Sequence, residues 1–87
     1  MAKKLDWKVT LDDGEHNVSL LYSMLTGKAV VTIDGDEFDI SEGFMKLRGT
    51  EQVFKLGDDA AILVFPKKGE PDIYINGIGV RSGKARE

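Results

Sequence analysis

Few residues in this chain could perform acid–base or nucleophilic chemistry, and they are widely spaced. His16 is the only histidine, the chain has no cysteine, and no serine lies in a Gly-x-Ser-x-Gly turn. Covalent catalysis needs a nucleophile beside a base, and no such pair is evident. His16 follows a turn and alternates in phase with Val18 and Leu20, so we interpret it as a partly buried residue hydrogen-bonded near that turn. The sequence predicts a protein that is not an enzyme and has no catalytic residues.

Acidic residues in two turns are the places where a cation could bind. They are Asp34, Asp36, Glu37 and Asp39 in one turn and Asp58 and Asp59 in the other. The twelve-residue calcium loop needs a glycine at its sixth position, and no glycine stands there. Zinc needs three or four nitrogen or sulfur ligands, which one histidine cannot supply. We therefore interpret these carboxylates as solvated turn residues and expect neither a metal nor a cofactor.

Two further motifs match functional patterns only superficially. The glycines of Gly77-Ile78-Gly79 resemble a nucleotide-binding loop, but such a loop lies between a strand and a helix, and no helix is predicted after it. Asn17-Val18-Ser19 fits a glycosylation acceptor, although no secretory signal accompanies it. Neither motif predicts a site.

Composition and charge exclude several classes of partner. The 87 residues include 12 basic and 15 acidic side chains, for a net charge of −3. Nucleic acids bind a basic face with interleaved aromatics, which is not evident here. The chain also has no run of about 18 apolar residues and no apolar signal core. We expect a cytoplasmic protein without a nucleic-acid or membrane partner.

Short turn signals at regular intervals indicate the elements that position these residues. Asp13-Gly14, Asp34-Gly35, Gly57-Asp58 and Asn76-Gly77 supply turn residues between alternating or apolar runs, which is typical of antiparallel hairpins. The predicted strands cover residues 7–11, 16–22, 28–33, 37–40, 44–47, 52–56, 60–65 and 72–75, followed by a short extension at 78–80.

Because no segment has the period of a long helix, the strands must cover one another. The sequence therefore predicts an all-β fold, an antiparallel two-sheet β-sandwich of about eight short strands. We expect one domain over residues 1–87, with a core at 6–80 and a tail at 81–87. Tyr74 and Phe65 are predicted to face outward. The predicted core residues are Trp7, Val9, Leu11, Val18, Leu20, Val31, Ile33, Phe38, Phe54, Leu56, Ile62, Val64, Ile73 and Ile75.

A series of motifs, taken together, is more specific than any one of them. The series is Trp7-x-Val9-x-Leu11-x-Asp13-Gly14-x-His16-x-Val18, Leu25-Thr26-Gly27-Lys28-x-Val30-Val31-x-Ile33-Asp34-Gly35, Phe44-Met45-Lys46-Leu47-x-Gly49, Phe54-x-Leu56-Gly57 and Ile75-Asn76-Gly77. In this order the motifs, from about Trp7 to Val80, resemble the first of the two tandem β-domains of the Fas apoptotic inhibitory molecule family. We expect a single-domain version of it.

The resemblance implies a non-enzymatic β-sandwich from a family whose animal members regulate death-receptor and neurotrophin signalling and are linked to keeping misfolded proteins in solution. It implies no catalytic residues. We therefore expect a small interaction module that binds a protein partner, and an unblocked sheet edge leaves room for a homodimer. The alternative is a ligand-binding or hydrolytic sandwich that acts on a sugar or small anion, or that binds calcium. It is suggested by the acidic turns and by Trp7, Tyr22 and Tyr74 as candidate stacking aromatics.

Overall fold

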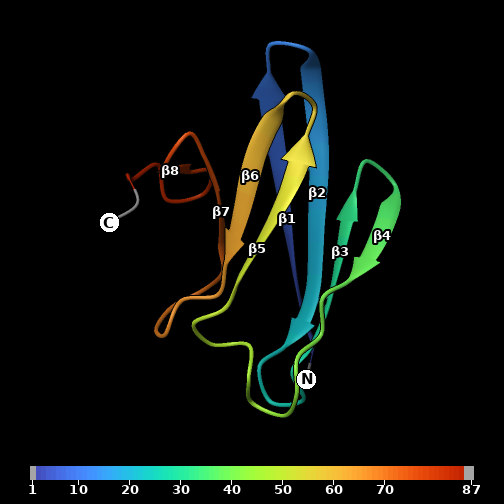
Figure 1. Cartoon of the computed structure of the whole chain (residues 1–87), viewed down its shortest axis with the longest axis vertical. Helices are drawn as coiled ribbons and strands as arrows, with labels where there is room; N and C mark the ends of the chain where they lie inside the picture. Colours follow the sequence, from blue (N-terminus) through green and yellow to red (C-terminus); the bar gives the residue numbers. More distant parts are fainter. Residues whose placement is uncertain (1, 86–87) are drawn as a thin grey trace.

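The alternating segments of the first half of the chain pair into one antiparallel sheet, and those of the second half into another. The computed structural model describes residues 2–85. The strand orders are β1-β2-β3-β4 and β5-β6-β7-β8, so each sheet in Figure 1 is a run of hairpins in chain order. The strands are β1 (Lys3–Leu11), β2 (Gly14–Ser23), β3 (Lys28–Ile33), β4 (Asp36–Asp39), β5 (Glu51–Leu56), β6 (Asp59–Val64), β7 (Asp72–Ile75) and β8 (Ile78–Gly79). Among residues 2–85, no helix is long and apolar enough to span a membrane.

Two tight turns have the backbone geometry that their sequences predict. Asp34 and Gly35 have φ angles of 48° and 94°, and Asn76 and Gly77 have φ angles of 53° and 80°. Positive φ at both central residues matches the twist of a two-residue hairpin, and asparagine, aspartate and glycine adopt it most easily. These turns join β3 to β4 and β7 to β8.

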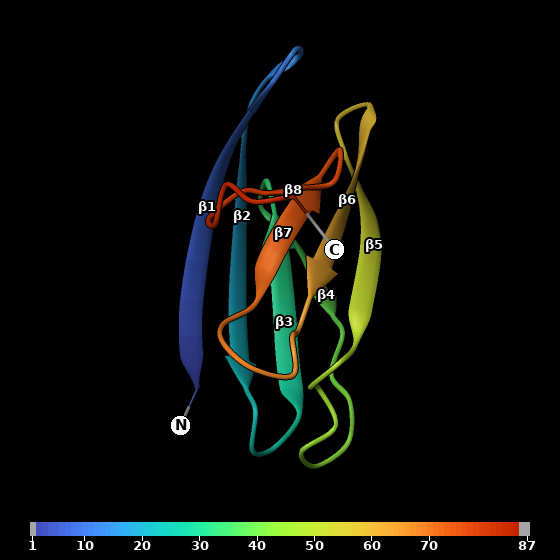
Figure 2. The same cartoon turned by 90° about the vertical axis from the view of Figure 1, so that its left-hand side faces the viewer.

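The two sheets lie face to face with the hydrophobic core between them, as Figure 2 shows. Tyr22 of β2 meets Phe65, just after β6, in an edge-on ring contact with centroids 6.0 Å apart. The indole of Trp7 in β1 donates a hydrogen bond to the buried carboxylate of Asp72 in β7. These contacts join the layers, and the prediction of an all-β, two-sheet architecture is confirmed.

Most of the predicted core is confirmed. Trp7, Val9, Val18, Leu20, Val31, Leu56, Ile73 and Ile75 are buried, and Leu11, Ile33 and Phe54 are partly buried against them. The prediction was wrong for Ile62 and Val64, which are only partly buried, and for Phe65, which is fully buried rather than outward-facing. Tyr74 is partly buried, in alternation with its buried neighbours.

The buried face of β6 was predicted wrongly because its residues are apolar without alternation, so the sequence does not indicate which of them face the core. Its orientation is instead set by pairing, since residues directly opposite in an antiparallel ladder share a face. Ala61 lies opposite Ile75, and Leu63 lies opposite Ile73. Because both isoleucines point into the core, Ala61 and Leu63 do so as well.

The predicted strand at residues 44–47 is wrong, because this segment is part of a loop between β4 and β5. The Met45 N–H donates to the Leu25 carbonyl, and the Lys46 N–H donates to the Gly43 carbonyl in a tight turn. Met45 has a φ of 58°, which is incompatible with a strand. Leu47 is buried, while Phe44 and Met45 point into solvent.

The described part of the predicted tail forms backbone contacts with β8. Residues 81–85 fold back, since Ala85 forms a β-bridge with Ile78 and the Gly79 N–H donates to the Lys84 carbonyl. Residues 86 and 87, the rest of the predicted tail, lie outside the described residues.

Candidate functional site

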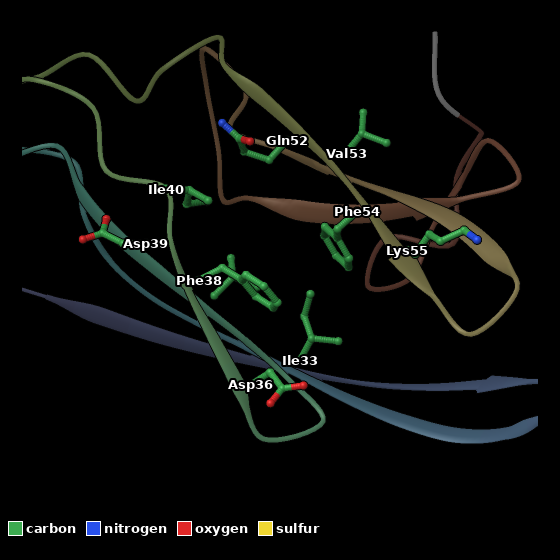
Figure 3. Close-up of a pocket in the computed structure, with 10 residues that line it drawn as sticks. Ile33, Asp36, Phe38, Asp39, Ile40, Gln52, Val53, Phe54 and Lys55 are labelled. Atoms are coloured by element: carbon green, nitrogen blue, oxygen red, sulfur yellow. The ribbon is translucent and has the colours of Figure 1, made fainter.

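An apolar groove opens where the free edge of the first sheet approaches the edge of the second. It has a volume of about 580 Å³ and runs between β4 and β5 (Figure 3). Phe38 and Ile33 from the first sheet and Phe54 from β5 point into the same space. The residues that line it are Val31, Ile33, Asp36, Phe38, Asp39, Ile40, Gln52, Val53, Phe54 and Lys55.

The groove exists because the sandwich is open along this side. Phe38 lies opposite Val31, which is buried, so its ring is on the inner face of the sheet. However, β4 is the last strand of its sheet, and β5 is the first strand of the other. No further strand covers Phe38 among the described residues, and 51% of its surface is exposed. The prediction that Phe38 is a core residue is therefore correct about the face of the sheet and wrong about the burial of its ring.

The rim of the groove on the β4 side is acidic. Asp36 and Asp39 are among its lining residues, and Figure 3 shows the Asp39 carboxylate directed away from the two phenylalanines. Glu37 lies between them in the same strand. Hydrogen bonds from Ser41 lower the pKa of Asp39, with a smaller effect from the charge of Lys28, so this carboxylate stays ionised. Lys55 of β5 is the cation in the lining, and Figure 3 shows its side chain extending away from the two phenylalanines.

The backbone of β4 also presents groups toward the outside. The Ile40 N–H donates to the Ala29 carbonyl over 2.9 Å, which identifies these two residues as a hydrogen-bonded pair. In an antiparallel ladder such pairs alternate with non-bonded ones. With Val31 opposite Phe38, the alternation turns the N–H and C=O groups of Glu37 and Asp39 away from β3. This edge can therefore accept another strand.

His16 lies in a separate cluster at the tips of the hairpins. Its Nε2 is 2.9 Å from Oδ1 of Asp13, and its Nδ1 is 2.7 Å from Oδ2 of Asp34. Because ionised carboxylates only accept hydrogen bonds, this arrangement favours the protonated, cationic form of the ring. These bonds, Asp13 first and then Asp34, raise the pKa of His16. The prediction of a partly buried, hydrogen-bonded histidine near a turn is confirmed, although its long-range partner Asp34 was not foreseen.

The other predicted site residues do not converge. Trp7 and Tyr22 are buried in the core, so neither offers a face on which a sugar could stack, contrary to the alternative interpretation. Asp58 and Asp59 lie at the β5–β6 hairpin. Within residues 2–85, no three histidine or acidic side chains are placed to hold a metal ion.

The groove itself was missed from the sequence, although one signal pointed to it. Asp36-Glu37-Phe38-Asp39 is a strand in which a single large apolar residue stands among acids. Such a pattern is unusual for a strand covered on one face, and it fits an edge that meets solvent. The contribution of β5 depends on the approach of two separate sheets and leaves no local signal.

Comparison with known proteins agrees with the motif series. The family model described as Fas apoptotic inhibitory molecule (FAIM1) matches residues 3–70, which is more than half of the chain. The match includes β1 to β6 and ends before β7, so the last motif, Ile75-Asn76-Gly77, lies beyond it. No curated protein and no solved structure gives a significant match.

Proposed function

The chain belongs to the Fas apoptotic inhibitory molecule family, and on this premise we propose that it is a small, non-enzymatic interaction domain of the cytoplasm. It binds a protein partner through the groove between β4 and β5. The exposed ring of Phe38 carries this proposal: an inward-facing aromatic residue is left half uncovered beside the partly buried Ile33 and Phe54. An apolar groove with a charged rim is typical of a protein-binding surface.

The remaining chemistry of the chain supports binding over catalysis. His16, the only histidine, has both ring nitrogens engaged by carboxylates and is not among the residues that line the groove. The hydroxyl beside the rim carboxylate of Asp39 is that of Ser41, which is held by the backbone of Ala29, and the groove lining contains no histidine to act as its base. The groove offers apolar area and fixed charge, which are means of recognition.

A photo-crosslinking experiment in cells tests this function. A benzophenone amino acid is placed at Phe38 in one variant and at Leu21 in a second. Leu21 is the matched control because it is also half exposed, on β2 and away from the groove lining. We expect a discrete crosslinked protein from position 38 and none from position 21. Equal crosslinking from both positions, or none from position 38, would contradict the proposal.

A further inference from the structure

The outer edge of β4 has the backbone geometry and the charge to bind a particular kind of segment. The inference drawn from them rests on the proposed function. We infer that β4 binds an extended, cationic segment of a partner protein, which adds to the first sheet as a fifth strand. Basic residues of that segment alternate with apolar ones, and an apolar side chain covers Phe38. The class of partner thus follows from three features of this edge.

The first feature is the direction of the backbone groups. The N–H and C=O groups of Glu37 and Asp39 are turned outward, and they can form the ladder with a new strand. The other edge of this sheet is less suitable, because β1 carries exposed Lys3, Lys4 and Lys8, and edge lysines oppose pairing.

The second feature is the alternation of side chains along β4. Phe38 is on the inner face, whereas Glu37 and Asp39 are on the outer face. Cross-strand neighbours share a face, so a residue of the added strand opposite Phe38 lies over the mouth of the groove. Residues opposite Glu37 and Asp39 lie on the solvent side. An apolar residue fits the first position, and lysine or arginine fits the other two.

The third feature is charge, which also decides against a second copy of this chain. The β3–β4 hairpin contains Asp34, Asp36, Glu37 and Asp39 within six residues. If two β4 strands paired antiparallel about Phe38, Glu37 of each copy would lie opposite Asp39 of the other. Like charges directly opposite one another destabilise a strand pair. Lys28 lies near Asp39 and Lys55 lines the far side of the groove, so the hairpin is only partly neutralised.

The test uses the whole chain and three synthetic peptides. The probe is acetyl-Lys-Val-Lys-Ile-Lys-Val-Lys-amide. One control replaces its lysines with glutamates, and the second keeps its composition but places all the lysines before the apolar residues. Binding is followed by NMR titration and by hydrogen exchange of the Glu37 and Asp39 amides. Exchange is the decisive measurement, because only a new backbone ladder protects these two amides.

We expect the alternating cationic peptide to slow exchange at both amides by about tenfold or more, and neither control peptide to do so. Phe38→Ser should weaken binding about tenfold, because the apolar anchor is lost. Leu21→Ser, a matched loss of an exposed apolar residue on β2, should leave binding unchanged. Glu37→Lys, at an exposed position, should shift the preference toward the acidic peptide.

Three outcomes would overturn the inference. They are equal binding of the block-ordered peptide, binding without protection of Glu37 and Asp39, and protection of these amides by self-association in the absence of peptide. If these occur while crosslinking from position 38 still captures a partner, the interaction function stands and strand addition by a cationic segment is wrong. If crosslinking also fails, the proposed function fails independently.

Discussion

The indole N–H of Trp7 donates a hydrogen bond to Oδ1 of Asp72 over 3.2 Å, across 65 positions of sequence. The same carboxylate accepts the backbone N–H groups of Ile73, Arg81 and Ser82. Asp72 is buried, and these four donors compensate for the loss of water around its charge. One side chain therefore fixes β1, β7 and the segment after β8 to one another.

Truncation of Trp7 separates the packing of the indole from its hydrogen bond. We expect Trp7→Ala to lower the free energy of unfolding by about 3–5 kcal/mol, because the indole is buried between the sheets. Trp7→Phe keeps most of the apolar volume and removes the donor, so its cost should be smaller. Chemical denaturation followed by circular dichroism measures both. Equal losses for the two variants would mean that the hydrogen bond, and not the packing, dominates.

Removal of the Asp72 carboxylate should be costly for a different reason. Asp72→Ala leaves the indole and the Ile73 N–H without a partner in a buried place, and the N–H groups of Arg81 and Ser82 in a part-buried one. We therefore expect a loss of about 3 kcal/mol or more. Glu70→Ala is the control, since Glu70 is exposed. Its ion pair with Arg81, at 3.7 Å, is open to solvent and contributes little to stability. Denaturant midpoints compare the two. A similar midpoint for both variants would contradict the role given to Asp72.

Gly27 is predicted to tolerate no side chain. It has a φ of 79°, and a Cβ atom there would collide with the carbonyl oxygen of Gly43. Gly49 has nearly the same φ, 80°, with open space around the added atom. Gly49→Ala should therefore cost about 1 kcal/mol from backbone strain alone. Gly27→Ala should cost clearly more, measured by thermal unfolding, because the loop after β4 must shift away from the β2–β3 turn.

Two phenylalanines whose burial differs from the sequence prediction, Phe65 and Phe38, give a test of the sheet register. Phe65 is fully buried, and we expect Phe65→Ala to cost about 3–5 kcal/mol. Phe38, half exposed at the groove, should cost only about 1 kcal/mol when replaced by alanine. Urea denaturation of the two variants distinguishes them. A larger loss at Phe38 would indicate that the sandwich is closed over the groove.

The His16 cluster should make stability depend on pH. Hydrogen bonds that His16 donates to Asp13 and Asp34 raise its pKa above the ordinary value of 6.5. The stabilising contribution of His16 is therefore complete below its unfolded-state pKa and is lost as the pH rises through its folded-state pKa. Because His16 is the only histidine, its imidazole signals in an NMR titration report this pKa directly. We expect Asp13→Asn and Asp34→Asn each to lower it, whereas Asp58→Asn should leave it unchanged.

Protonation of Asp34 determines the low-pH end of the range in which the same cluster stabilises the fold. The N–H of Asn17 and then the ring of His16 lower the pKa of Asp34 below 3.8. Its contribution is present above the unfolded-state value and is lost as the pH falls through the folded-state pKa. The cluster thus stabilises the fold most between these two limits. Denaturation of the wild type and of His16→Asn over this pH range should show a difference that disappears at high pH.

Turn chemistry and alternation were sufficient to predict most of the strands. Aspartate, asparagine and glycine at the hairpin turns adopt positive φ in their own local context, so β3 and β4 could be placed without knowledge of any neighbour. The same holds for Trp7 and Val9, whose alternation gave the buried face of β1 directly. Residues 44–47 are of types that are common in strands, yet Met45 adopts a positive φ and its N–H donates to the Leu25 carbonyl. That choice depends on a partner in another hairpin.

The sequence by itself determined the hairpins, the all-β class and the family, because each depends on local backbone preference or on an ordered series of motifs. Tertiary structure alone decided which face of β6 is buried, which acid accepts from Trp7 and where the sandwich stays open. Each of these depends on how two separately formed sheets meet. The groove at Phe38 is the clearest case. Its ring is exposed because β4 is the edge strand of its sheet and no further strand of the described residues covers it.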